Sequence, residues 1–174
     1  MKIVVCSLAA LRRVIVEHEP SHVVTLLSDE GLIEQASAIA PEHHLRLAMN
    51  DIELADDGMV SPERAHLEEL IHFVDTWDRE KPMIIHCWAG ISRSTAAAFT
   101  ALCRFNPSVP ERSIARALRN ASPVASPNRL IVAHADSYLG RDGRMIEAIN
   151  GIGRGRSAWQ NDPFSLPVEF GAEV

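Results

Sequence analysis

The sequence predicts a single α/β domain with a central, mostly parallel β-sheet flanked by helices. The chain has 174 residues, of which 47 % are hydrophobic and 23 % charged, an ordinary composition for one globular domain. Short apolar runs typical of buried strands alternate with stretches whose apolar residues recur at helical spacing. Only a few residues separate the most apolar strand from the helix that follows it, and this order favours parallel strands.

The amino-terminal half alternates strands with helices. Its expected elements are a strand at 2–6, a helix at 7–18, a strand at 22–27, a short helix between Gly31 and Ile39, and a weaker strand at 44–49. The clearest helix of the chain begins with Ser61 as its N-cap and Pro62 at the first helical position, and it extends to Arg79. Because its apolar residues share one face, we expect that face to pack against the sheet.

The carboxyl-terminal half begins with a buried strand at 83–86 and an alanine-rich helix at 92–104. Further helices are expected at 110–120 and from an N-cap at Ser126 to a stop at Gly140. Residues 1–150 are taken as the domain. The tail, residues 151–174, has no period, so it either packs on the domain or is mobile.

Charge and cysteine content argue against nucleic-acid-binding, membrane-binding and disulfide-stabilised classes of protein. The 17 basic and 23 acidic residues give a net charge of −6, which disfavours binding to nucleic acid or to an acidic membrane. Three cysteines cannot build a disulfide framework. We find no export signal, and no apolar run reaches the ~18 residues needed to cross a bilayer. We therefore expect a cytoplasmic monomer or small homo-oligomer.

The strongest local signal lies where the buried strand at 83–86 meets the following helix. It reads His86-Cys87-Trp88-Ala89-Gly90-Ile91-Ser92-Arg93-Ser94. A loop that contains a glycine can turn successive N–H groups inward, and the positive end of the next helix adds to them, so the loop is expected to bind an oxyanion. The same dipoles and the Arg93 guanidinium favour the thiolate form of Cys87, which is a nucleophile.

The other polar residues of this stretch have distinct expected roles. The planar guanidinium of Arg93 can hold two phosphoryl oxygens and stabilise a phosphoryl-transfer transition state. Ser94 can donate its hydroxyl to the sulfur of Cys87 when that sulfur leaves phosphorus. We expect His86 to brace the loop through backbone hydrogen bonds rather than act as a base, because the strand points its ring away from the loop floor.

The pattern His-Cys-x5-Arg-Ser resembles the signature of the cysteine-dependent protein tyrosine phosphatases, and Ala-Gly-Ile-Ser-Arg-Ser resembles their dual-specificity branch. The chain looks like a small cytoplasmic member of bacterial type, and the resemblance in segment order extends from Met1 to about Leu139. It implies a three-layer phosphatase fold and hydrolysis of phosphomonoesters through a phosphocysteine on Cys87, without cofactor or metal. It also implies that Trp88, Ala89, Gly90, Ile91, Ser92 and Arg93 bind the substrate.

A second motif lies near the expected start of a late helix. Ser126-Pro127-Asn128 resembles the Ser-Pro-Asn element of that family, in which the asparagine helps to hold the phosphate loop. The alternative is plain helix capping by Ser126, with Asn128 solvated.

The family also has an aspartic acid, about thirty residues before the cysteine, that protonates the leaving oxygen. Asp51 follows a strand-like run, as the family's acid does, but it precedes Cys87 by 36 residues. Asp56 and Asp57 precede it by 31 and 30 residues, nearer to the family spacing. We favour Asp51, with the residues after it forming a longer loop, and keep Asp56 as the reserve acid. Asp57 is a weaker candidate.

Members of the family that act on inositol phospholipids tend to carry basic residues inside the loop, whereas the residues between Cys87 and Arg93 are uncharged here, which disfavours such substrates. Phosphotyrosine is the leading substrate, in a phosphoprotein or a small aryl phosphate. A pocket that also accepts phosphoserine or phosphothreonine remains an alternative. Trp88 either provides an apolar wall for an aryl group or packs outward. Two rival functions are a catalytically silent module that binds phosphorylated proteins and a rhodanese-like sulfurtransferase.

Several other features are discounted. The histidines at 43, 44, 66 and 72 have the wrong spacing for a zinc site. The run Gly153-Arg154-Gly155-Arg156 is interpreted as a surface linker. Cys6 and Cys103 are expected in the core, with a role as resolving thiols for an oxidised Cys87 as the alternative.

Overall fold

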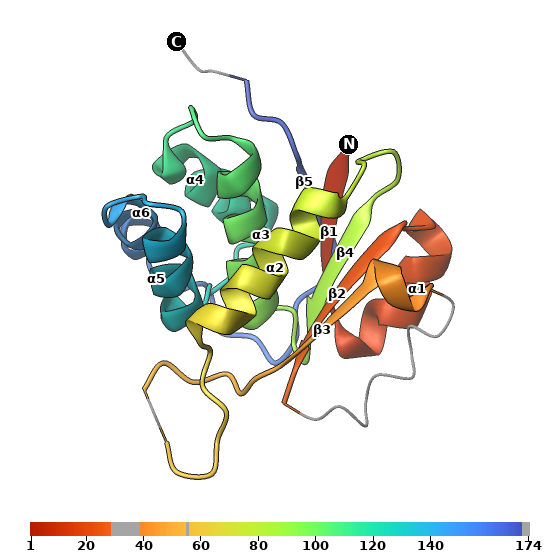
Figure 1. Ribbon diagram of the computed structural model, residues 1–174, viewed down its shortest axis with the longest axis horizontal. Coiled ribbons are helices and arrows are strands. Elements are labelled where there is room, and N and C mark those ends of the chain that lie inside the picture. Colours follow the sequence, from red (N-terminus) through yellow and green to blue (C-terminus); the bar gives the residue numbers. More distant parts are fainter. Residues whose placement is uncertain (29–38, 55, 172–174) are drawn as a thin grey trace.

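A five-stranded sheet in the order β3-β2-β4-β1-β5 forms the centre of the computed structural model, which describes residues 1–28, 39–54 and 56–171 (Figure 1). The strands are β1 (Lys2–Ser7), β2 (His22–Leu27), β3 (His44–Ala48), β4 (Met83–Cys87) and β5 (Phe164–Pro167). The α-helices are α1 (Leu8–His18), α2 (Arg64–Thr76), α3 (Arg93–Phe105), α4 (Glu111–Ala121), α5 (Arg129–Tyr138) and α6 (Arg144–Ile152). A 3-10 turn, η2 (Pro41–His43), precedes β3.

Four of the strands are parallel and the edge strand β5 is antiparallel. Strand β4 lies between β1 and β2 and is parallel to both, and β3 is parallel to β2. Strand β5 pairs with β1 in the opposite direction, with Val5 opposite Phe164. The expected mostly parallel α/β sheet is confirmed, and the carboxyl ends of its parallel strands meet at one edge.

Helices cover both faces of the sheet and make three layers. Helix α1 lies on one face, where Leu11 and Val14 pack against Val4 and Ile84. The other helices lie on the opposite face (Figure 1). Because neighbouring side chains of a strand point to opposite faces, β1 supplies Val4 to one core and Val5 to the other.

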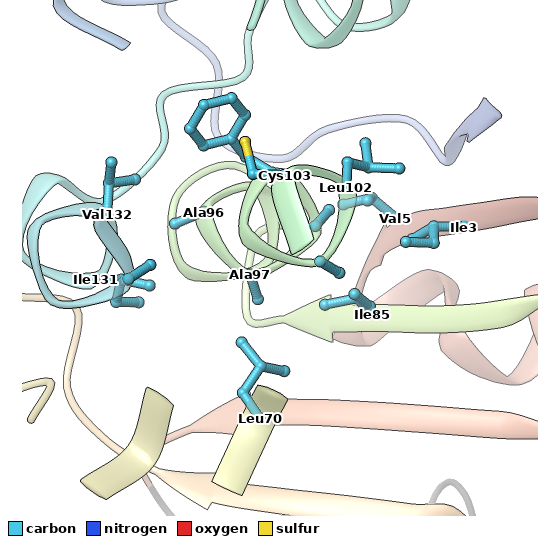
Figure 2. Packing of buried hydrophobic residues seen from close by; sticks show 14 of the residues in the cluster. Ile3, Val5, Leu70, Ile85, Ala96, Ala97, Leu102, Cys103, Ile131 and Val132 are labelled. Atoms are coloured by element: carbon cyan, nitrogen blue, oxygen red, sulfur yellow. The ribbon is translucent and has the colours of Figure 1, made fainter. Parts of the chain in front are cut away.

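Helix α3 passes through the middle of the larger core, and all its residues from Arg93 to Cys103 are buried. Figure 2 shows α3 between Ile131 and Val132 of α5 on one side and Ile3 and Val5 of β1 on the other. Its alanines allow the flanking elements to approach closely. This packing holds the first turn of α3, and the loop before it, in a fixed position.

Two expected helix starts are wrong, and the structure shows why. Helix α2 begins at Arg64 rather than Pro62, because the Glu63 carboxylate and the His66 side chain form a capping box with each other's backbone N–H groups. Helix α5 is capped by Asn128 rather than Ser126. The Asn128 side chain accepts hydrogen bonds from the N–H groups of Leu130 and Ile131. The expected short helix between Gly31 and Ile39 falls almost wholly outside the described residues.

The expected tail contains ordered structure. Helix α6 extends across the expected boundary at residue 150, and strand β5 joins the sheet. In the described part of this segment, β5 is held at the edge of the sheet by its pairing with β1. Among the described residues, no helix is both long and apolar enough to cross a membrane.

Candidate active site

The loop at 88–92 connects the end of β4 to the start of α3 at the carboxyl edge of the sheet. Cys87 is the last residue of β4, and Arg93 is the first residue of α3. Ligands of parallel α/β sheets bind at this edge, where helix N-termini supply free N–H groups. Cys87 is only 1 % exposed, so its sulfur lies at the floor of the loop.

Two donors approach the Cys87 sulfur. The Ser94 Oγ is 3.1 Å from Sγ, and the backbone N–H of Gly90 donates to Sγ at 3.3 Å. An ionised sulfur can only accept hydrogen bonds, so Ser94 donates to it in that state. Both donors and the N-terminus of α3 therefore lie at the sulfur.

The carbonyl groups of the loop all bond to surrounding protein. The backbone N–H groups of Leu8, Ser126 and Asn128 donate to the carbonyls of Trp88, Ile91 and Ser92, respectively. Asn161 donates to the other two, from its backbone N–H to the carbonyl of Ala89 and from its Nδ2 to the carbonyl of Gly90. In a trans peptide unit the C=O and the next N–H point in opposite directions. With the carbonyls directed outward, the N–H groups are directed into the loop. No acceptor is found among the described residues for those of Ala89, Ile91 and Ser92, which leaves them available to an oxyanion.

Glycine is required at position 90 for two reasons. Its φ of +73° lies in the left-handed region. A Cβ there would also lie 2.8 Å from the carbonyl carbon of Cys6 and 2.9 Å from the nitrogen of Ser7. The loop is thus pressed directly against the backbone of β1.

The Arg93 side chain is buried, and its guanidinium contacts Met49 and approaches Asp51. Its Nη1 donates to the carbonyl of Met49 at 2.8 Å, just beyond the end of β3. Its Nε is 3.8 Å from Asp51 Oδ2, and among the described residues this buried N–H has no hydrogen-bond partner. A buried donor without a partner is costly, so the arrangement suits an anionic ligand.

Asp51 lies beside the loop, whereas Asp56 and Asp57 do not contact it. The Asp51 Oδ1 accepts from Ser92 Oγ at 2.6 Å and from Asn128 Nδ2 at 2.9 Å. Asp56 and Asp57 are exposed, and within the described residues neither side chain has a hydrogen bond or ion pair. The geometry therefore places Asp51, of the three candidates, at the loop.

Asn128 is 1 % exposed and links the loop of Asp51 to α5. It donates to Asp51 Oδ1 and, at 3.2 Å, to the carbonyl of Ile52, while its own oxygen caps the helix. The alternative that Asn128 is solvated is therefore wrong. Ser126, expected as the cap, instead donates its backbone N–H to Ile91.

His86 is buried beneath the loop with partners that the sequence did not indicate. Its Nε2 is 2.6 Å from the Thr25 hydroxyl, which is also 2.8 Å from Nε2 of His44. Burial lowers the pKa of His86 to about 3 and that of His44 to about 4. Both rings are therefore neutral at pH 7, and the Thr25 hydroxyl can donate to one ring and accept from the other.

The remaining candidates lie around this centre or away from it. The Trp88 ring is 60 % exposed and points away from the core.

All three cysteines are buried and unpaired, and burial raises the pKa of the Cys6 thiol to about 12. Cys103 lies near the far end of α3. In the part of the chain that the structure describes, no cluster of histidine, cysteine and carboxylate side chains could hold a metal ion.

Four residues at the site were missed from the sequence: Thr25, His44, Met49 and Asn161. They reach it only because β2, β3 and the segment before β5 meet at the loop. No local motif marks them.

Comparison with known proteins shows the fold. No family model and no curated protein sequence matches the chain. Among solved structures, the PTP-2 phosphatase of Cydia pomonella has a TM-score of 0.61 and is 21 % identical over 78 % of this chain and 84 % of that one. The Yvh1 phosphatase domain from Chaetomium thermophilum has a TM-score of 0.59 and is 21 % identical over 82 % and 93 %. Human DUSP28 has a TM-score of 0.61 and is 20 % identical over 80 % and 92 %.

The likeness covers most of each chain, so this protein has the three-layer fold of the dual-specificity and protein tyrosine phosphatases. The expected fold and the structural resemblance to that group are confirmed.

Proposed function

We propose that the protein is a cysteine-dependent phosphatase that hydrolyses phosphomonoesters. The observation that supports this most strongly is the combination around Cys87. Ser94 and the Gly90 N–H approach its sulfur. Other N–H groups of the same loop, and the buried Nε of Arg93, have no acceptor among the described residues. Such a set of donors matches the negative charge of a transferring phosphoryl group.

In the first proposed step, the Cys87 sulfur attacks phosphorus in line with the leaving oxygen. The P–S bond forms as the P–O bond breaks, and Asp51 transfers its proton to the leaving oxygen. In the second step, water attacks phosphorus and gives a proton to Asp51. The new P–O bond forms as the P–S bond breaks, and the Ser94 hydroxyl gives a hydrogen bond to the departing thiolate of Cys87. Inorganic phosphate is released, and both residues return to their starting forms.

The favoured substrate carries phosphotyrosine or another aryl phosphate. No charged side chain lies between Cys87 and Arg93, and the exposed ring of Trp88 is next to the loop. We propose a phosphorylated protein as the natural partner and the cytoplasm as the location, because a reducing compartment keeps Cys87 as a free thiol. We propose a monomer or small homo-oligomer as the functional form.

The test is phosphate release from p-nitrophenyl phosphate in the presence of EDTA. We expect turnover by the wild type and none by Cys87→Ser. The matched control is Cys103→Ala, which alters another buried cysteine away from the loop and should retain turnover.

Three other results would contradict the proposal. Binding of a phosphotyrosine peptide by the wild type without turnover would indicate a silent binding module. Transfer of sulfur from thiosulfate to cyanide, without phosphate release, would indicate a sulfurtransferase. Equal turnover by Cys87→Ser and the wild type would exclude a phosphocysteine.

A further inference from the structure

The segment between α6 and β5 crosses the carboxyl edge of the sheet and contacts the candidate phosphate loop. Its residues Trp159, Gln160 and Asp162 are exposed, and Trp159 is 99 % exposed. Asn161 between them is only 6 % exposed. A single buried polar residue in an exposed segment indicates a specific set of partners.

The partners of Asn161 are two consecutive carbonyls of the loop. Its backbone N–H donates to the carbonyl of Ala89 at 2.9 Å, and its Nδ2 donates to the carbonyl of Gly90 at 2.9 Å. The Ser122 hydroxyl, just after α4, accepts from Asn161 Nδ2 at 2.9 Å and lies 3.1 Å from Asn161 Oδ1. Asn161 is therefore held by the body of the domain while it bonds to the loop.

These two bonds orient the loop's N–H groups. The carbonyl of Ala89 shares a peptide plane with the N–H of Gly90, and the carbonyl of Gly90 shares one with the N–H of Ile91. Holding both carbonyls outward turns both N–H groups inward. One of them is the donor to the Cys87 sulfur, and the other has no acceptor among the described residues.

We propose that Asn161 is a positioning residue, through which the carboxyl-terminal segment sets the geometry of the oxyanion-binding loop. Its effect on turnover rests on the proposed phosphatase function. Its effect on the Cys87 sulfur does not, because the contact between Gly90 and that sulfur exists in the loop without substrate.

The chain offers a matched control in Asn106. This asparagine is also buried, at 8 % exposure, and it also binds the carboxyl-terminal segment. Its Nδ2 donates to the carbonyls of Leu102 and Val168, and its Oδ1 accepts from the N–H of Phe170. It thus anchors the chain just beyond β5 without touching the loop.

The experiment compares Asn161→Ala with Asn106→Ala in three measurements. These are the melting temperature, the dissociation constant of tungstate, and the pH dependence of Cys87 alkylation by iodoacetamide. We expect both variants to melt at lower temperature. Only Asn161→Ala should weaken tungstate binding, by about tenfold or more, and require a higher pH for half-maximal alkylation of Cys87. Its kcat should fall more than its KM rises.

Equal tungstate affinity and equal alkylation profiles in the two variants would overturn the proposal. If Asn161→Ala does not fold, Ser122→Ala removes only the hydroxyl beside Asn161. It should shift both readouts in the same direction by a smaller factor, and unchanged readouts would contradict the inference. A wild type that neither turns over substrate nor binds tungstate would refute the phosphatase proposal, whereas the alkylation profiles would still test Asn161.

Discussion

The two carboxylate oxygens of Asp51 have different surroundings. Oδ1 accepts hydrogen bonds from Ser92 and Asn128, which hold the side chain beside the loop. Oδ2 is 3.8 Å from Nε of Arg93, and the side chain is 38 % exposed. In the proposed reaction, Oδ2 is therefore the oxygen that would hold the proton for the leaving group, while Oδ1 keeps the carboxyl in place.

Replacing Asp51 should have an effect that depends on the leaving group. Asp51→Asn keeps a similar shape but cannot donate a proton as an acid. We expect it to lower kcat by about 10²- to 10⁴-fold with phenyl phosphate, whose leaving group needs protonation, and much less with p-nitrophenyl phosphate. Steady-state kinetics with both substrates measures this. Asp56→Asn is the control, and a large loss there with full activity in Asp51→Asn would assign the acid to Asp56.

The site residues that could be predicted from local pattern alone are those in one contiguous motif, whereas Asp51 and Asn128 were expected only from the family resemblance. Cys87, Arg93 and Ser94 follow one another at a strand-loop-helix junction, so local geometry brings them together. Thr25 and Asn161 contact His86 and the loop from distant parts of the chain, and their side chains are common in structural roles. Nothing in a single sequence distinguishes them from other buried polar residues.

The loop between β4 and α3 depends on close contact with β1. Gly90 combines a positive φ with a Cβ position blocked by the backbone of Cys6 and Ser7. Gly140 also has a positive φ, of +62°, but a Cβ there would meet nothing within 4 Å. Alanine at Gly140 would therefore test backbone strain alone, whereas alanine at Gly90 would test backbone strain together with steric exclusion by β1.

Gly90→Ala should destabilise the protein more than Gly140→Ala. Both variants incur the cost of a left-handed alanine, but only the first must push the loop away from β1. We expect its free energy of unfolding to fall by about 1–3 kcal/mol more than that of Gly140→Ala, as measured by urea denaturation. Equal losses would mean that the loop is not held against β1.

The elements that could be predicted have long or strongly apolar patterns. The strand at 22–27 was predicted with its observed bounds, and six other predicted helices or strands differ from the structure by at most one residue at either end. Helix α6 and strand β5 were missed. Strand β5 has only four residues, and its stability comes from pairing with β1 at the other end of the chain. At both wrongly predicted helix starts, a serine followed by a proline matched the usual N-cap pattern. The observed caps, Glu63 and Asn128, lie two residues later, and their side chains accept hydrogen bonds from N–H groups of the first turn.

Four segments that are distant in sequence meet at the loop: the end of β3, the start of α5, the segment before β5, and β1. Beneath them, His44 of β3 and His86 of β4 share the hydroxyl of Thr25 in β2. This buried contact links three neighbouring strands directly below Cys87. It also makes the stability of the protein depend on pH.

The sign of that dependence follows from the lowered pKa values. In the unfolded chain a histidine has a pKa of about 6.5, and in the folded protein burial lowers the pKa of His44 to about 4 and that of His86 to about 3. Between pH 6.5 and these lowered pKa values, the unfolded chain binds more protons than the folded protein does. The free energy of unfolding is therefore unaffected by this pair above pH 6.5 and falls as the pH decreases toward 4.

Urea denaturation at pH 7 and pH 5 tests this. We expect His44→Gln to reduce the fall in the free energy of unfolding between these pH values by about 2 kcal/mol. His72→Gln removes an exposed histidine of α2 and should leave the wild-type fall unchanged. An unaltered pH dependence in His44→Gln would contradict the buried neutral pair.

The most direct test is the reactivity of Cys87 with iodoacetamide as a function of pH, followed by mass spectrometry of its peptide. Only the thiolate reacts, and burial raises the pKa values of the Cys6 and Cys103 thiols, so those residues stay unreactive in the range examined. We expect Cys87 of the wild type to be alkylated at lower pH than Cys87 of Ser94→Ala, which lacks the hydroxyl beside the sulfur. Identical pH profiles in the two proteins would contradict an anionic nucleophile held by the donors of the loop.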